Sequence, residues 1–125
     1  MARSIPGWKI VHDDRERLLG RFPPRYERTI ADHITLKFGA DDGAPLPTAN
    51  SGEIVGEADD GAGVQALVVR IEGTTDRGDG SHFHITWSLG PQRAAKESND
   101  VIRQHGWRAV RPPVPVRLMP ARWKF

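Results

Sequence analysis

The sequence has 125 residues, no cysteine, and 18 lysine and arginine residues against 16 aspartate and glutamate residues, which gives a net charge of +2. This length fits a single domain, spanning 1–125, that can bury a core without cross-links. The lack of cysteine excludes disulfides, thiolate nucleophiles and cysteine-ligated metal sites. The net charge is too small to indicate an electrostatic footprint for duplex nucleic acid.

The expected location follows from apolar patterning. No stretch approaches the roughly 20 apolar residues of a membrane helix. The first residues, MARSIPGWKI, lack the apolar run of a signal peptide. We therefore expect a cytoplasmic protein that makes no membrane contact.

The charges are unevenly distributed along the chain. Residues 103–124 carry six basic side chains and no acidic one, whereas residues 41–60 carry six acidic side chains and no basic one. A basic C-terminal stretch suits an anionic partner, and it equally suits a solvated strand face. The sequence leaves both interpretations open.

The first predicted element is a short amphipathic helix over HDDRERLLGRF, residues 12–22. Asp13 or Asp14 is the expected N-cap, and the inward positions are Leu18, Leu19 and Phe22. Pro23 and Pro24 cannot continue a helix, so a connecting segment follows.

Four strands are predicted between turn-rich stretches such as ADDGAPLPTANSG and GTTDRGDGS. They are expected at Asp32–Gly39, Gly52–Ala58, Val64–Glu72 and His82–Leu89. Antiparallel strands of this kind, together with the helix above and a second one predicted near the end of the chain, indicate an α+β fold.

The last third of the chain predicts a second short helix and then extended structure. The helix is expected over PQRAAKESNDVIRQHG, with Pro91 near its first position, Gly106 past its end, and apolar positions at Ala94, Ala95, Val101 and Ile102. Over residues 107–125, Val114, Val116 and Leu118 alternate with Pro115, Arg117 and Met119, as in a strand. The prolines limit this stretch to an edge position in a sheet.

Two of the predicted strands carry the same triplet, HIT, followed by a large apolar residue. Because successive side chains of a strand point to opposite faces, one face of each strand is polar: His33, Thr35 and Lys37 in the first, and His82, His84, Thr86 and Ser88 in the second. The opposite face of each strand is apolar and is expected to pack into the fold. The repeated triplet predicts that the polar faces form two halves of one groove.

Two histidines and two threonines suit phosphodiester chemistry. Opening a 2′,3′-cyclic phosphate needs one group that takes a proton from the attacking oxygen and another that gives one to the leaving oxygen. Imidazole titrates near neutrality and can do either. A threonine hydroxyl two residues away can donate to the phosphate oxygens, on which negative charge grows in the transition state.

At these triplets the sequence resembles a known family. HITL at residues 33–36 and HITW at residues 84–87 are similar to the paired His-x-Thr motifs of the 2H phosphoesterase superfamily, which includes RNA 2′,3′-cyclic phosphodiesterases and the phosphodiesterase domain of tRNA ligases. The resemblance implies antiparallel strands in two pseudo-symmetric lobes around a central cleft. It also implies metal-independent hydrolysis of a cyclic phosphate on an RNA end or a small nucleotide, without a cofactor. The implied catalytic residues are His33, Thr35, His84 and Thr86.

Three further residues are weaker candidates for substrate binding. Lys37 continues the polar face and could hold a phosphate, although a single strand lysine is often solvated. His82 could contact substrate in the cleft or lie on its rim. Tyr26, the only tyrosine, could stack on a base or cover the core.

Other classes of function remain open at this stage. In the first, His82 and His84 are two ligands of a catalytic metal, although the next acidic residue, Glu97, falls in the predicted helix. In the second, the chain is a non-catalytic nucleotide- or RNA-binding module. In the third, it is a structural or interaction domain. No protein partner is indicated by the sequence.

Overall fold

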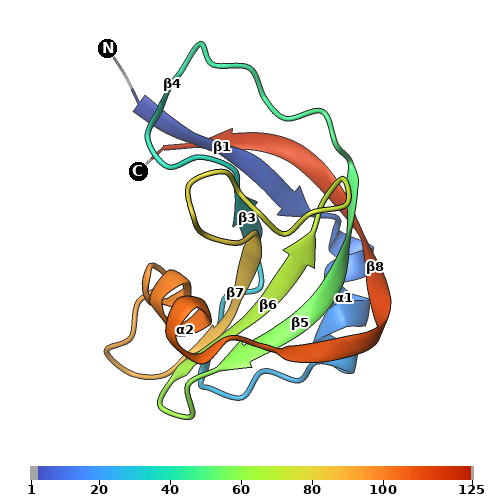
Figure 1. Ribbon diagram of the computed structural model, residues 1–125, viewed down its shortest axis with the longest axis vertical. Coiled ribbons are helices and arrows are strands. Elements are labelled where there is room, and N and C mark those ends of the chain that lie inside the picture. The colour runs from blue at the N-terminus through green and yellow to red at the C-terminus, as the bar shows by residue number, and fades with distance from the viewer. Residues whose placement is uncertain (1–2, 125) are drawn as a thin grey trace.

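The computed structural model describes residues 3–124 and is an α+β fold with a mostly antiparallel sheet and two short helices (Figure 1). This confirms the predicted fold class at that level. In chain order the elements are β1 (Arg3–Ile10), α1 (His12–Arg21), β2 (Arg28–Thr29), β3 (His33–Thr35), β4 (Ala40–Asp41), β5 (Ser51–Asp59), β6 (Val64–Arg70), β7 (His84–Leu89), α2 (Glu97–His105) and β8 (Arg108–Trp123).

The strands belong to one strongly curved sheet. Its order runs β7-β3-β1-β8-β5-β6, with β2 beside β7 and β4 beside β1, and an additional pairing of β6 with β7 closes the ring. Every pairing between the named strands is antiparallel. The closure brings β7 between β3 and β6, and this position matters for the site.

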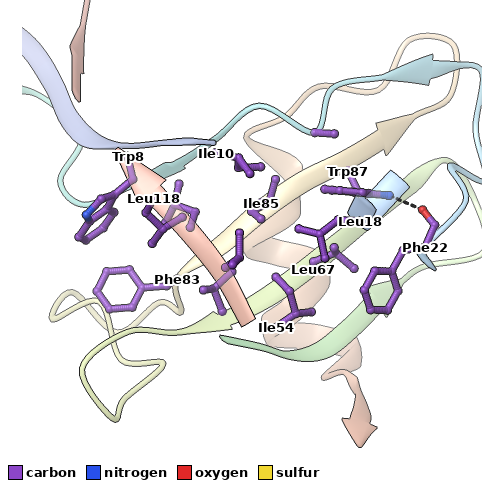
Figure 2. Close-up of a cluster of buried hydrophobic side chains, with 14 of the residues drawn as sticks. Trp8, Ile10, Leu18, Phe22, Ile54, Leu67, Phe83, Ile85, Trp87 and Leu118 are labelled. Carbon is purple, nitrogen blue, oxygen red and sulfur yellow. Dashed lines mark hydrogen bonds between the residues drawn. The ribbon is translucent and has the colours of Figure 1, made fainter. Parts of the chain in front are cut away.

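Aromatic and branched side chains fill the inside of the curved sheet (Figure 2). Ile34, Ile85 and Trp87 are fully buried there, which confirms the predicted apolar faces of the two HIT strands. The buried Trp87 indole is satisfied, because its Nε1 donates to the carbonyl oxygen of Phe22 at 2.7 Å. Phe38 is the exception to the predicted pattern: it is 66% exposed, because β3 ends at Thr35.

Helix α1 begins without the predicted aspartate cap. Its N-cap position is Val11, and no side chain caps the helix. The Asp14 carboxylate instead accepts hydrogen bonds from the Arg117 backbone N–H at 2.6 Å and from Arg117 Nη2 at 2.8 Å, which attaches α1 to β8. The side-chain bond from Arg117 lowers the pKa of Asp14 more than burial raises it.

Helix α2 begins at Glu97, six residues later than Pro91, near which the sequence predicted its start. The Glu97 carboxylate accepts hydrogen bonds from the Ala94 backbone N–H at 2.7 Å and from Arg93 Nε at 3.1 Å, so these residues form a turn ahead of the helix. Val101 and Ile102 are buried against β5 and β6, in a second apolar cluster that also includes Leu89 at the end of β7. The start of α2 therefore lies over the outer face of the sheet.

The prolines of strand β8 predicted an edge position in the sheet. This prediction is wrong, because β8 lies between β1 and β5. Its first part, residues 108–117, pairs with β5, and its last part, residues 118–123, pairs with β1. Each part thus has one paired side, as an edge strand has. This explains why Pro115 and Pro120 are tolerated within it.

The basic and acidic stretches pair with each other. Arg108 Nη2 lies 2.6 Å from a Glu57 carboxylate oxygen, and Lys124 forms an ion pair with Asp42. The antiparallel pairing of β5 with β8 brings Arg108 to Glu57. Two other basic residues pair outside the acidic stretch, Arg117 with Asp14 and Arg103 with Asp100. The basic side chains of Arg108, Arg117 and Lys124 nevertheless remain largely exposed, in agreement with the solvated strand face that was one of the two explanations.

Strand β1 was not predicted, because Pro6 and Gly7 interrupt its pattern. It lies between β3 and β8, and Gly7 is required there: a Cβ on this residue would lie 2.1 Å from the carbonyl oxygen of Ile34. Within residues 3–124, none of the helices has the length and apolar character needed to cross a membrane.

Candidate functional site

The two HIT triplets lie side by side. Strands β3 and β7 pair antiparallel with Ile34 opposite Ile85, the central residue of each triplet. Since both isoleucines point into the core, the flanking histidines and threonines point to the outer face. The register sets each histidine near the threonine of the other triplet, so a local twofold relates the two halves.

The outer face at this point is a cavity of about 390 Å³, here called the histidine cavity. The four residues that the sequence predicted as catalytic all line it. Its other walls come from β1, from the segment after β3, from the β6–β7 loop and from the start of α2: Ile5, Phe38, Arg77, Ala95, Lys96 and Asn99. Among these described lining residues Arg77 and Lys96 are cationic and none is acidic, so the cavity favours an anionic ligand.

His33 is oriented by the preceding residue. Its Nδ1 lies 3.0 Å from Asp32 Oδ2, and the same oxygen accepts a 2.6 Å hydrogen bond from Lys9 Nζ. Burial raises the pKa of Asp32, but the hydrogen bonds from Lys9 and His33 lower it more, so the carboxylate is ionised. An ionised carboxylate only accepts. The His33 Nδ1–H therefore donates, which leaves Nε2 for a substrate.

His84 is oriented by its own strand. Its Nδ1 lies 2.8 Å from the carbonyl oxygen of His82, so Nδ1–H donates and Nε2 is again the free nitrogen. The ring lines the open cavity but is surrounded by protein on its other sides. That burial lowers the pKa of His84, and the nearby charges of Arg77, His33 and His82 lower it further. His84 is therefore neutral near pH 7.

The two threonines are not equivalent. Thr86 is buried, and its Oγ1 lies 2.9 Å from Ser98 Oγ of α2 and 3.4 Å from the Ala95 carbonyl oxygen. Thr35 is half-buried, and no side-chain hydrogen bond to its hydroxyl is found within residues 3–124. The Thr35 hydroxyl is thus the one available to a ligand without breaking a protein contact.

Two lining residues that the sequence analysis did not single out are Arg77 and Asn99. Arg77 lies in the β6–β7 loop, in a stretch assigned only as turns, and its side chain is 8% exposed. Asn99 comes from α2, and its Oδ1 is buried with no hydrogen-bond partner among the described residues. Neither carries a sequence signal, since loop closure and helix packing alone bring them to the cavity.

The structure does not bring the three weaker candidates into the histidine cavity. Lys37 is exposed and lines a neighbouring groove of about 1000 Å³, because β3 ends at Thr35 and the strand alternation stops there. His82 lines a separate cavity of about 310 Å³, with its ring 4.9 Å from that of Trp107.

Tyr26 lies in a polar cluster away from the histidine cavity. Its hydroxyl donates to Asp59 Oδ1 at 2.6 Å, and burial together with this bond raises its pKa. Arg25 Nη1 binds the same carboxylate at 2.7 Å. These contacts hold the Tyr26 hydroxyl in the protein, whereas the sequence left open whether the ring stacks on a nucleobase or covers the core.

The metal alternative has little geometric support. His82 and His84 line different cavities. No group of three or more histidine, aspartate or glutamate side chains that could hold a metal ion is found within residues 3–124.

Comparisons with known proteins return no relative. The chain matches no family model, no curated protein and no solved structure. The resemblance to the 2H phosphoesterases therefore rests on the two HIT triplets themselves.

Proposed function

We propose that the protein is a metal-independent phosphodiesterase that opens a 2′,3′-cyclic phosphate on an RNA end or a small nucleotide. One observation carries the proposal: two His-x-Thr triplets from distant parts of the chain line a single cavity in which the other charged side chains, Arg77 and Lys96, are cationic. The two histidines supply proton transfer, and the cationic walls suit a phosphodiester anion.

The reaction is an in-line attack of water on phosphorus. One imidazole Nε2 takes a proton from the water as its oxygen bonds to phosphorus. The bond from phosphorus to the 2′ or 3′ oxygen breaks, and the second imidazolium gives that oxygen a proton. The product is a phosphomonoester with one free ribose hydroxyl, and a proton exchange with solvent resets both rings.

We assign the base to His84 and the acid to His33. His84 is neutral because burial and nearby cationic groups lower its pKa, and a neutral ring is what a general base requires. His33 is the remaining proton donor of the pair, and the Asp32 carboxylate, 3.0 Å from its Nδ1, holds the ring with Nε2 available to the leaving oxygen.

The threonines act on the phosphate oxygens. The Thr35 hydroxyl can donate directly, whereas the Thr86 hydroxyl must share its bond with Ser98. Each donor aimed at a growing negative charge contributes about 10²–10³-fold to kcat. The two-lobed arrangement of the 2H superfamily stays part of this proposal only in its pseudo-symmetry, which the local twofold between β3 and β7 supports, because the two triplets lie in one closed sheet.

The test is a hydrolysis screen in excess EDTA. The substrates are the four common nucleoside 2′,3′-cyclic phosphates and short RNAs that end in a cyclic phosphate, and ³¹P NMR reads the position of the phosphate in the product. We expect ring opening to a monophosphate at a rate that EDTA does not change. Activity that EDTA removes and a divalent ion restores would contradict the two-histidine mechanism and favour a metal enzyme.

His12→Ala is the matched control for His33→Ala and His84→Ala. His12 is exposed at the start of α1 and outside the histidine cavity, so its loss should leave the rate unchanged. Binding of a cyclic nucleotide without any turnover would instead indicate the non-catalytic module.

A further inference from the structure

Arg77 is a buried cation that the proposed proton transfers do not use. Its side chain is 8% exposed, although arginine is rarely buried without a reason. It lines both the histidine cavity and the neighbouring groove of about 1000 Å³, so it lies where the two meet. Arg77 and His84 both line the histidine cavity, and the charge of Arg77 lowers the pKa of His84.

The loop that carries Arg77 is held by its own hydrogen bonds. The Arg77 backbone N–H donates to the Ser81 carbonyl oxygen at 3.0 Å, and the Gly78 N–H donates to Asp76 Oδ1 at 2.8 Å. Gly78 and Gly80 have φ values of 101° and 88°, which favour glycine. The loop therefore fixes the backbone of Arg77 beside the cavity.

One edge of the guanidinium is held by Asp79, two residues away. Arg77 Nη2 lies 3.0 Å from Asp79 Oδ2, and Nε lies 3.4 Å from Oδ1. Hydrogen bonds from Ser81 and then Arg77 hold the pKa of Asp79 well below its usual range, so it is a fixed anion. Nη1 has no hydrogen bond to any of the described residues. The N–H groups of Nη1, on the side away from Asp79, are therefore available to a ligand.

An arginine held in this way is suited to phosphate. Its planar fork matches the geometry of phosphate oxygens, and charge-assisted bonds of this kind are about twice as strong as neutral ones. Asp79 occupies one edge of the guanidinium, and the described lining of the histidine cavity adds no second carboxylate that would compete for Nη1.

We propose that Arg77 binds the non-bridging oxygens of the substrate phosphate in the histidine cavity and stabilises the negative charge that grows on them during ring opening. The binding step stands without the proposed reaction, whereas the catalytic step rests on the proposed function. Arg77 would then be a third kind of catalytic group beside the histidines and threonines.

The first experiment measures binding of inorganic phosphate by NMR titration, without any turnover. Arg77→Gln should weaken binding by about 10- to 100-fold, because one charge-assisted bond pair is lost. Arg21→Gln is the matched control: it removes the same charge from an exposed position at the end of α1, and should leave binding unchanged. Unchanged phosphate affinity in Arg77→Gln, or no phosphate binding in the wild type, overturns the inference.

A second variant covers the case in which Arg77→Gln does not fold, as judged by thermal unfolding. Arg77→Lys keeps the charge but loses the fork, and should bind phosphate severalfold more weakly than the wild type. Equal affinity would then overturn the inference.

The second experiment follows kcat/KM on adenosine 2′,3′-cyclic phosphate. Arg77→Ala should lose most activity and regain part of it in millimolar guanidinium chloride, a rescue that a purely structural role would not give. The acidic limb of the pH profile should also move to higher pH in this variant, because His84 loses the adjacent cation while His33, His82 and Lys96 remain. Absence of both effects overturns the catalytic role of Arg77.

The two proposals fail in distinguishable ways. Phosphate binding that depends on Arg77, in a wild-type protein that opens no cyclic phosphate, contradicts the proposed function and leaves the anion site. Turnover that depends on both histidines but not on Arg77 contradicts the inference and leaves the proposed function.

Discussion

Asp32→Asn tests whether the Asp32 carboxylate holds the His33 ring in one orientation and one tautomer for catalysis. The bond between Asp32 and His33 Nδ1 is 3.0 Å long, and the Asp32 side chain is 49% exposed. A protected hydrogen bond to a charged group contributes about 1.5–3 kcal/mol. Solvent at a half-exposed carboxylate reduces this to about 1 kcal/mol, which corresponds to a loss of about fivefold to tenfold in kcat. The loss should be far smaller than the roughly 10⁴-fold seen when the aspartate of a Ser-His-Asp triad becomes asparagine.

The assay combines initial rates on adenosine 2′,3′-cyclic phosphate with ¹⁵N NMR of the imidazole rings. In the wild type we expect the neutral His33 ring to carry its proton on Nδ1. In Asp32→Asn the ring should populate the other tautomer, because the amide can itself donate to Nδ1. Asp13→Asn changes an exposed carboxylate of α1 and is the matched control. A folded Asp32→Asn protein with unchanged kcat and an unchanged tautomer would refute the reasoning.

Three further predictions concern the histidine pair, the threonines and the attachment of α1. His33→Ala and His84→Ala should each remove most turnover, and the double variant should be little worse than either. The reason is that the effects of residues that act as one unit are not additive. Losses that multiply in the double variant would indicate independent roles. Thr35→Ala should lower kcat by about 10²-fold and Thr86→Ala by less, because only the Thr35 hydroxyl is free to donate. Steady-state kinetics measure both losses, and a larger loss in Thr86→Ala would contradict this reasoning. Asp14→Asn should lower the free energy of unfolding in urea by about 2 kcal/mol. The folded protein lowers the pKa of Asp14. The difference in free energy of unfolding should therefore have its full size above about pH 5 and be lost as the pH falls below about 4 and Asp14 becomes protonated. A difference that persists in acid would count against the ion pair.

Local periodicity was enough to predict which residues share a face. The alternation within HIT puts Ile34 and Ile85 on one side and the histidines and threonines on the other, and this depends only on strand geometry. The repetition of the triplet then predicted that the two polar faces form two halves of one groove, and both triplets do line one cavity. In the structure they pair directly, with Ile34 opposite Ile85.

The remaining walls of the site could not be predicted, because tertiary contacts determine them. β1 contributes Ile5, but Pro6 and Gly7 hide its strand character, and Gly7 is explained only by its close approach to β3. The expectation for Lys37 assumed that β3 continues, whereas it ends at Thr35. Arg77 reaches the cavity through loop hydrogen bonds that no periodicity encodes.

The two triplets are alike in sequence, and their surroundings make them different. His33 Nδ1 lies beside the Asp32 carboxylate, whereas His84 Nδ1 binds a backbone carbonyl oxygen, and burial with an adjacent arginine lowers the pKa of His84. Thr35 has a free hydroxyl, and Thr86 is bound to α2. In a symmetric pair of histidines with equal pKa values, either ring could carry the proton, so neither ring would be fixed as the acid or the base. Asp32, Arg77 and α2 make the two halves unequal, so in the proposed reaction the direction of proton transfer depends on these neighbours more than on the triplets.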